Sequence, residues 1–586
     1  MPFQVSPGVS VVETDLTTIV PTISTTAAGF VGFFGWGPAN EIRTISSENE
    51  LRQVYGDPDD DNFSYWFSAG NFLRYGSNLQ VVRAVEGSGR NSGSLFSSDG
   101  SGGVSGAFPL SEKLTSSTSS INGTGYGTFM AKYPGPIGNN IGVAAWDGMG
   151  NSGQTFTDWG FDQYFREAPD TTARAQERTG ITTGFCDEVH VIVYDATGYF
   201  TGTKNEPLEI FEGLSKATDA KKDDGTSNYY RTVINNSSEY ILATKASNTG
   251  ISTEGTAEEK TIQEYYNGVA TASVPSIMDG LTAGFGFAGG SAGLETSEIV
   301  TQYNDLFANS ETQDVSLLIS GPADNTLRNT IVDIAETRKD CVAFVSPDLN
   351  DVTGIAESLK ADAVISARND VTTKSSYAVM DSGWKYQYDP YNDKFRYIPL
   401  NPDVAGLCAK TDQIAEPWFS PAGFNRGAIR NVIKLAYSPD KTDRDKLYVK
   451  GVNPVVSFTG EGIVLFGDKT MQAKPSAFDR INVRRLFNVL EKSISTAAKF
   501  SLFEFNDEFT RAAFRNLVEP FLRDVQARRG IFDFKVVCDE TNNTPLIIDK
   551  NEFRADIYVK PARSINFITL NFVASPTGVD FDEIGA

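Results

Sequence analysis

The sequence predicts a multidomain protein with α/β and α+β regions, and three observations indicate this fold class. Its 586 residues correspond to several domains, at roughly 150 residues each. After Gly293, short apolar strands alternate with helices, which is the pattern of a parallel α/β sheet. From Ile481 to Phe572 the order is helix, helix, strand, hairpin and strand, which indicates a compact α+β unit.

The first 90 residues are expected to hold a terminal arm and the beginning of the α/β region. Residues 1–20 contain Pro7, Gly8 and a few alternating apolar positions, too few to fold alone, so this arm is predicted to add a strand to another sheet. Residues 21–90 are predicted to be the N-terminal part of the α/β region. Its expected elements are a strand at 30–34, a helix that begins with the capping box of Ser47 and Glu50, a helix at 65–75 and a strand at 79–85.

Two segments of different composition follow. Residues 91–128 are dominated by Gly, Ser and Thr and are predicted to form a linker or long loop. Residues 129–290 have strand-like patterns that polar loops interrupt, most clearly at Val189–Tyr194. This segment is predicted to be an inserted, β-rich domain at the surface.

Residues 291–472 are predicted to form the main α/β domain, because their apolar strands are short and separated by helices. The expected elements are helices at 295–307, 325–337 and 355–359, and strands at 315–319, 341–345 and 377–380. No internal repeat is present in the pattern.

Residues 473–564 are predicted to be a C-terminal α+β domain, and residues 565–586 a second arm. The second helix of this domain is expected to begin at a cap on Asn506 and to end before Gly530. Its buried face is predicted from a four-residue repeat of Phe509, Ala513, Leu517, Phe521 and Val525. Two half-buried strands are predicted from the alternation of Phe532, Phe534, Val536 and Cys538, and of Phe553, Ala555, Ile557 and Val559.

The composition argues against several classes of protein. The net charge of −23 disfavours wrapping of nucleic acid, which depends on neutralising phosphates with Lys and Arg. No apolar run approaches the roughly 18 residues of a membrane span, and the first 20 residues do not resemble a secretion signal. The four cysteines lie far apart in the sequence, so we expect buried thiols in a reducing compartment and no zinc or disulfide framework.

Two sequence features suggest catalysis or cofactor binding only weakly. His190 is the only histidine, so a Ser-His-Asp site has one possible base, but its position inside a strand favours a packed side chain. Gly284, Gly286 and Gly289 match the GxGxxG pattern of dinucleotide sites. A turn precedes the motif and more glycines follow it, so a flexible loop is predicted and no cofactor is expected.

Two further charged segments are interpreted structurally. The acidic run 57–61 lacks the spacing of a calcium loop and is predicted to be solvated. Residues 384–397 mix aromatic and charged side chains, as a nucleic-acid groove does. Pro390, Asn392 and Asp393 at the centre favour a hairpin or a partner surface instead.

Several stretches resemble one family, the contractile tail sheath proteins of long-tailed bacteriophages. The N-terminal stretches are Ser6–Val9 with Glu13, Phe30–Tyr55, Ala131–Gly135 with Gly138–Asn140, Phe200–Thr203 with Tyr229 and Tyr230, and Phe287–Gly290. The most specific are Tyr386–Asp389 with Asp403–Gly406, Pro417–Arg426 and Gly451–Pro454 with Gly467, and the C-terminal unit adds Arg485–Phe487, Cys538, Asp539 and Asn542. The resemblance covers nearly the whole chain in the family's order.

The resemblance implies a subtilisin-like topology for the parallel α/β domain, without protease activity, and a structural role without cofactor or metal. It implies self-assembly into stacked hexameric rings of a helical sheath. The implied partners are the tail tube protein, the baseplate and the tail terminator, with no nucleic acid and no membrane insertion. The implied location is the virion tail, after assembly in the host cytoplasm.

Both terminal arms are expected to exchange strands with neighbouring subunits, which would join the subunits through backbone hydrogen bonds. The expected residues are Val5, Val9, Val11 and Glu13 in the first arm and Ile565, Phe567, Ile568, Leu570 and Phe572 in the second. The second arm is apolar on both faces, as in a strand that is buried between subunits.

The C-terminal domain is expected to face the tail tube. Residues 469–530 carry twelve Lys and Arg against seven Asp and Glu, so this part is basic in an acidic chain. The candidate contacts to an acidic tube are Arg511, Arg515, Arg523 and Arg528, and the alternative is that these bases only solvate the helix. Two other functions stay open from the sequence: the sheath of a phage-derived contractile injection particle, and a serine hydrolase that uses His190 on the subtilisin-like domain.

Overall fold

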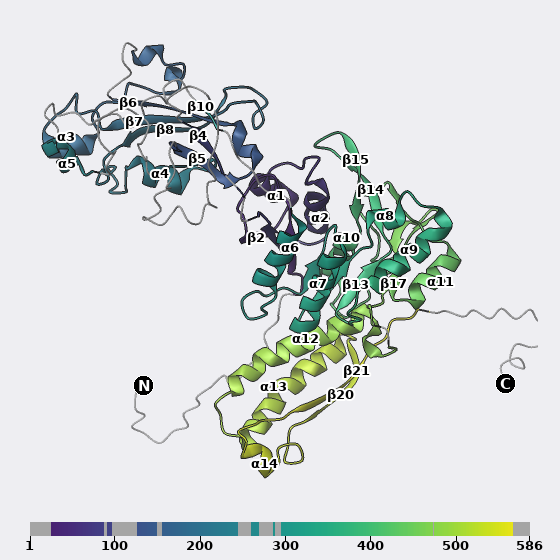
Figure 1. The fold of residues 1–586 in the computed structure, drawn as a ribbon. Coiled ribbons are helices and arrows are strands. Elements are labelled where there is room, and N and C mark those ends of the chain that lie inside the picture. Colours follow the sequence, from purple (N-terminus) through teal and green to yellow (C-terminus); the bar gives the residue numbers. More distant parts are fainter. Residues whose placement is uncertain are drawn as a thin grey trace, which may run out of the picture.

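A seven-stranded sheet lies at the centre of the protein, as Figure 1 shows. The structure is a computed structural model, and it describes residues 25–86, 89, 91–95, 126–148, 155–243, 260–268, 285–287, 295–472 and 474–566. The strands of the sheet, in spatial order, are β17 (Val452–Asn453), β13 (Ala378–Asp381), β12 (Val342–Val345), β11 (Leu317–Ile319), β1 (Ala28–Gly32), β3 (Leu79–Arg83) and β2 (Ile42–Ile45). All neighbours pair in parallel except β2 and β3. The sheet confirms the predicted parallel α/β fold.

Helices cover both faces of this sheet, because side chains of parallel strands must be buried on both sides. One face packs against α1 (Glu48–Tyr55), α2 (Phe63–Leu73) and α10 (Asn401–Ile414). The other packs against α6 (Thr296–Gln302) with the π-helix Tyr303–Phe307, α7 (Asn325–Arg338), α9 (Glu357–Asp370) and α11 (Lys441–Val449). The Ser47 hydroxyl accepts a hydrogen bond from the Glu50 amide, which confirms the predicted start of α1.

Strands β1 and β3 come from the N-terminal region, and β11 joins the other side of β1 only after residue 295. The intervening residues therefore form an insertion between two strands of one sheet. Figure 1 shows this insertion as a separate body at one end of the molecule. The predicted strand around His190 is confirmed as part of β7 (Glu188–Asp195).

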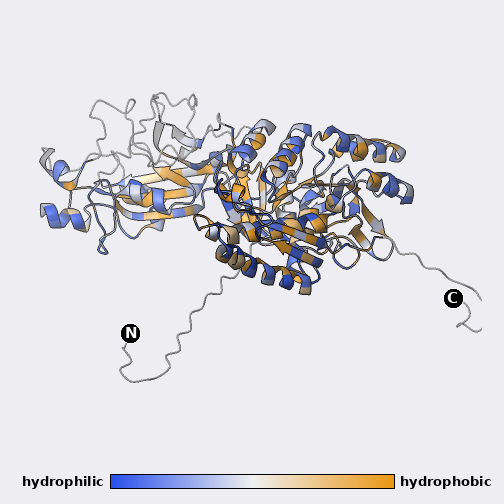
Figure 2. Ribbon diagram, turned by 90° about the horizontal axis from the view of Figure 1, so that it is seen from below, coloured by the Kyte–Doolittle hydropathy of each residue, from blue (hydrophilic) through white to orange (hydrophobic). Residues whose placement is uncertain are grey.

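The described part of the inserted domain contains two small antiparallel sheets. The first has the order β10 (Phe285–Gly286), β6 (Ile141–Asp147), β7 and β8 (Pro207–Ser215), and the second is β4 (Asn91–Leu95), β5 (Tyr126–Pro134) and β9 (Ile241–Ala243). Three short helices accompany them: α3 (Ala173–Thr179), α4 (Tyr230–Ser237) and α5 (Ile262–Gly268). Figure 2 shows the apolar residues concentrated on the strands, with polar residues on the helices around them.

Residues 91–128 were predicted to form a linker or long loop, and that prediction is wrong at both ends, because residues 91–95 form β4 and pair with β5, which begins at Tyr126. Residues 96–125 lie outside the described residues. Gly286 of the GxGxxG pattern is the end of β10 and pairs with Gly142, whereas Gly284 and Gly289 lie outside the described residues. The described part of the motif is therefore a strand end.

Smaller elements complete the α/β domain. The predicted hairpin at 384–397 is confirmed as β14 (Trp384–Asp389) and β15 (Lys394–Pro399), with β16 (Lys434–Leu435) on the other side of β14. The remaining elements are α8 (Leu349–Val352) and the hairpin of β18 (Val455–Phe458) and β19 (Gly462–Leu465).

The C-terminal domain contains α12 (Ile481–Ala498), α13 (Glu508–Ala527), β20 (Ile531–Val537), α14 (Pro545–Ile548) and β21 (Asp556–Pro561). In Figure 1 the two long helices lie side by side below the central sheet, with the β20–β21 hairpin beneath them. Among the described helices, none is long and apolar enough to cross a bilayer.

Three predictions for this domain are corrected. The Asp507 carboxylate, and not Asn506, caps α13 by accepting from the Thr510 amide. The buried side of α13 carries Phe514, Val518, Leu522 and Val525. The prediction of Ala513, Leu517 and Phe521 is therefore wrong, since the buried residue is in each case the next one along the chain, and only Val525 was predicted correctly. Phe532 is 70% exposed, because a register shift between Ile531 and Asp533 interrupts the alternation that Phe534 and Val536 continue.

Candidate intersubunit surfaces

His190 has no catalytic surroundings. Its Nε2 lies 2.9 Å from the Glu167 carbonyl oxygen, its Nδ1 accepts from the Gly213 amide at 3.1 Å, and its ring stacks on Phe165. The side chain is buried on β7 in the inserted domain and not in the α/β domain. With both ring nitrogens engaged by the backbone, His190 is a packed core residue, and the proposed hydrolase site is wrong.

The described residues also contain no group of three or more His, Cys, Asp or Glu side chains that could hold a metal ion. The acidic run 57–61 is engaged by cations of its own chain. Asp60 pairs with Lys394 at 2.8 Å and with Arg396 at 2.7 Å, so this run ties α2 to the β14–β15 hairpin.

The four cysteines are free and buried in the described structure, at positions 186, 341, 408 and 538. Burial raises the pKa of Cys341 and of Cys408 to about 12, so these thiols stay protonated near neutral pH. In the described structure all four side chains are packed in the interior.

The β20–β21 hairpin has the geometry that strand addition requires. Among the described residues, each of the two strands pairs only with the other, so both outer edges of this sheet are unpaired. One face packs against α13 through Phe534, Val536, Ile557 and Val559. An open edge with a supported inner face accepts an additional strand by backbone hydrogen bonds.

The predicted exchange residues lie almost entirely outside the described residues: Val5, Val9, Val11, Glu13, Phe567, Ile568, Leu570 and Phe572. Ile565 is described and is 83% exposed, directly after the chain leaves β21. It borders a cavity of about 640 Å³ that Ser476, Arg480, Arg563 and Asn566 also line.

The predicted tube-contacting arginines have different environments. Arg511 is buried and donates to the Asn506 side-chain oxygen at 3.0 Å, so it supports the turn before α13 and is not a surface contact. Arg515 is half-buried. Arg523 is exposed and lies 3.4 Å from Glu519, and Arg528 pairs with Glu416 and Asp524 at 3.1 Å each.

The loop between α12 and α13 exposes apolar side chains that were not predicted to be at the surface. The exposed members are Phe500, Leu502, Phe503 and Phe505, and Phe509, the second residue of α13, is also exposed. A signal for this surface is present in the sequence, because residues 499–507 place large apolar residues at nearly every second position beside a helix cap. Exposed apolar residues in such density are typical of interaction sites.

Comparisons with known proteins identify the family. A family model described as phage tail sheath protein central domain matches residues 299–471, and one described as phage tail sheath C-terminal domain matches residues 473–575. The tail sheath protein of Vibrio phage KVP40 is 35% identical, with 99% of each chain covered. The tail sheath protein of Enterobacteria phage T4 is 34% identical over 99% of each chain.

Solved structures agree with the fold. The sheath tail protein from Desulfitobacterium hafniense has a TM-score of 0.52 at 11% identity, covering 95% of this chain and 97% of that chain. The sheath tail protein Lin1278 from Listeria innocua has a TM-score of 0.51 at 11% identity, with 92% and 96% covered. The chain therefore belongs to the phage tail sheath protein family and is a structural, non-enzymatic subunit of the contractile tail sheath in a myovirus-type virion.

Proposed function

We propose that this subunit polymerises around the tail tube by exchanging strands through its two arms. The observation that carries the proposal is the two-stranded β20–β21 sheet, whose outer edges are unpaired in the described structure. Residues 1–20 and 565–586 supply the strands, and each neighbour's sheet receives one. A repeated head-to-tail contact that does not close on one subunit produces a helical array, here built from stacked hexameric rings.

In this proposal the sheath stores free energy in a metastable extended form and drives the tube through the host envelope on contraction. The arms keep neighbouring subunits joined while the globular domains change their packing, so no nucleotide is required. The baseplate releases the contraction and the tail terminator ends the polymer. Assembly takes place in the host cytoplasm. The proposal also includes a subtilisin-like topology for the α/β domain.

A backbone substitution in the first arm tests strand exchange. Proline lacks the N–H that a ladder needs, so Val11→Pro should leave a folded subunit that does not polymerise. Val11→Thr keeps the N–H and a β-branched side chain, and it is the matched control that should polymerise normally. Deletion of residues 1–14 should behave as Val11→Pro does. Sedimentation and electron microscopy give the outcome, and normal polymers from the deletion variant would contradict the proposal.

We also propose that Arg515, Arg523 and Arg528 contact an acidic tail tube, with Arg511 removed from the predicted set because it is buried. Arg523 and Arg528 support this, since both are more than half exposed. The partner of Arg523 is the half-buried Glu519, and those of Arg528 are the half-buried Glu416 and the exposed Asp524. Contacts of this kind weaken as salt increases. Replacing the three arginines by Glu should shorten the sheaths that form on tubes, whereas Arg174→Glu in the inserted domain should not. Sheaths of normal length from the triple variant would exclude the contact.

A further inference from the structure

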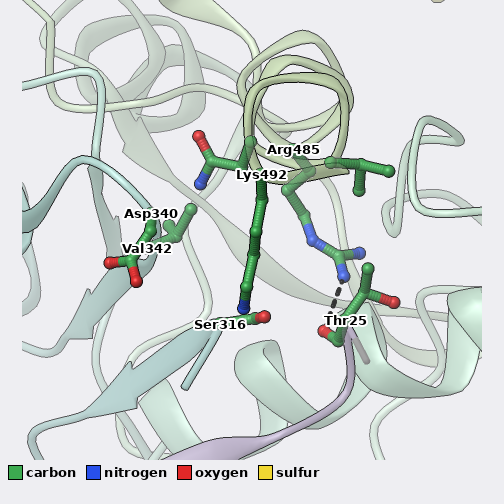
Figure 3. A pocket seen from close by; sticks show the side chains of 8 residues that line it. Thr25, Ser316, Asp340, Val342, Arg485 and Lys492 are labelled. Atoms are coloured by element: carbon green, nitrogen blue, oxygen red, sulfur yellow. Dashed lines mark hydrogen bonds between the residues drawn. The ribbon is translucent and has the colours of Figure 1, made fainter. Parts of the chain in front are cut away.

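The base of the N-terminal arm is held by a buried ion pair. Thr25 is the first described residue, and its hydroxyl donates to the Asp412 carboxylate at 2.6 Å. Arg485 of α12 binds the same carboxylate with two hydrogen bonds of 2.8 and 2.6 Å and also donates to the Thr25 carbonyl oxygen at 3.4 Å. Figure 3 shows the Arg485 side chain extending from α12 to Thr25. Arg485 is 4% exposed, so water does not screen this pair.

The base of the C-terminal arm is held in a similar way by a second carboxylate. Ser564 donates to Asp468 at 2.8 Å, and the Asn566 side chain donates to Asp468 at 3.2 Å and to the Tyr448 hydroxyl at 2.7 Å. Arg480 donates to Asp468 at 3.1 Å and to the Tyr448 hydroxyl. The Asp468 side chain is 5% exposed and the Arg480 side chain 21% exposed, so this second anchor is centred on a buried carboxylate.

The two anchors share one helix. Arg480 immediately precedes α12, and Arg485 lies in its second turn, about 7.5 Å further along the axis at 1.5 Å per residue. The backbone adds a bond, because the Ile481 amide donates to the Asp468 carbonyl oxygen at 2.8 Å. The N-terminal end of α12 is therefore bonded directly to Thr25 through Arg485, and it is linked to the base of the C-terminal arm through Asp468 and Tyr448.

The first anchor lies between the N-terminal arm and strand β1 of the central sheet. Three residues after Thr25 the chain enters β1, the strand between β11 and β3 in the central sheet. Without the anchor, a force that pulls on the arm would act directly on Ala28 and peel β1 from its neighbours. With it, the force passes through Asp412 and Arg485 into α12.

We propose that Arg480, Arg485 and the first turns of α12 form a load-bearing tie between the two arms, which carries tension from one neighbouring subunit to the next without loading the central sheet. This inference rests on the proposed strand exchange, because only then does each arm carry tension. The tie acts during contraction, when the arms stay attached while the globular domains change their packing. The tie consists of charge-assisted hydrogen bonds to two buried carboxylates, those of Asp412 and Asp468. Removing the arginine that binds a buried carboxylate destabilises the structure strongly, because the carboxylate is left without its partner.

Single-molecule pulling of the full chain by its two ends tests the tie without any polymer. Arg480→Gln and Arg485→Gln should each speed the first unfolding event at constant force by about tenfold or more, because each variant loses at least one charge-assisted bond. Thr25→Val and Ser564→Ala are milder variants that remove a single hydroxyl, and they should act in the same direction while preserving the fold.

The matched control is Arg338→Gln. Arg338 is also a buried arginine, paired with Asp340 at 2.8 Å, but it bonds neither arm. It should leave the first unfolding event unchanged. An unchanged rate in the variants of both anchors, or an equal acceleration in the control, overturns the tie. Failure of strand exchange has a different signature, since polymers would then persist when residues 1–14 are deleted.

Discussion

The Lys385 ammonium lies 2.9 Å from the Asp403 carboxylate, and both side chains are completely buried between the hairpin β14–β15 and helix α10. Burial lowers the pKa of Lys385 and raises that of Asp403, and each group partly offsets this effect on the other. The Tyr75 hydroxyl donates to the same carboxylate at 2.9 Å, which brings the turn after α2 into the network.

Removing one member of this pair should destabilise the α/β domain strongly. Asp403→Leu leaves the Lys385 charge buried without its partner, so we expect a loss of about 3–5 kcal/mol in the free energy of unfolding. The double variant Lys385→Met with Asp403→Leu removes both charges and should lose less than the single variant. Urea unfolding monitored by tryptophan fluorescence measures both. If the double variant has a lower free energy of unfolding than Asp403→Leu, the two charges are not coupled as described.

Gly406 permits the close contact between α10 and Tyr75, in the turn that follows α2. A Cβ atom at this position would lie 2.5 Å from the Tyr75 ring and within 3.0 Å of its Cβ. Gly406→Ala gains about 1 kcal/mol of helix propensity but overpacks the contact by about 1–3 kcal/mol, so we expect a net loss of stability. Gly160→Ala is the control, because no heavy atom lies within 4 Å of its Cβ position. The midpoint of thermal unfolding should fall only for Gly406→Ala.

The corrected face of α13 can be tested by two truncations on the same helix. Leu522 is buried against the C-terminal core, so Leu522→Ala should cost about 2–5 kcal/mol. Phe509 is 81% exposed, and Phe509→Ala should change stability by no more than about 0.5 kcal/mol. Unfolding of the purified subunit in urea separates the two outcomes, and the reverse ranking would restore the face predicted from the sequence.

The buried thiols give the protein a stability that falls at alkaline pH. The pKa of Cys341 and Cys408 is about 12 in the folded chain and about 8.5 when unfolded. Between these values the folded state retains protons that the unfolded state has released. The free energy of unfolding therefore decreases as pH rises, by about 1.4 kcal/mol per pH unit for each thiol, and is unaffected by these groups at lower pH.

Replacing both residues by Ala isolates this effect. The cavities reduce stability at every pH, but the decline between pH 9 and 10.5 should become shallower than in the natural sequence. Other ionising groups are common to both proteins, so only the difference between the two slopes is informative. Parallel slopes would show that these thiols do not remain protonated in the folded chain.

The elements that were predicted correctly are those set by residues close together in the sequence. The cap at Ser47 depends on residues three apart, and the hairpin around Asn392 and Asp393 depends on its own turn, and both were found as expected. Strand β4 has the sequence Asn-Ser-Gly-Ser-Leu, with little strand propensity, and forms because β5 pairs with it from more than 30 residues away.

The errors in the C-terminal domain have the same origin. Helix α13 carries two adjacent apolar rows, one with Leu517 and Phe521 and one with Val518 and Leu522, and packing on α12 and β20 decides which is buried. Asn506 has cap chemistry, but its side-chain oxygen accepts from Arg511. Its amide nitrogen donates to the Asn543 side chain and the Glu552 carbonyl oxygen, which leaves the cap to Asp507. Contacts between distant segments decide such choices, and one sequence does not display them.

The position of β1 between β3 and β11 also determines the order in which the protein is completed during synthesis. The ribosome delivers β1 and β3 first, but their sheet waits for β11, β12 and β13 and is finished only when β17 emerges at Asn453. The strands described for the inserted domain have all emerged by Gly286. Domains fold as units as they leave the ribosome, so the inserted domain is complete before the α/β domain that encloses it. More than 280 residues are translated between β1 and its partner strand β11.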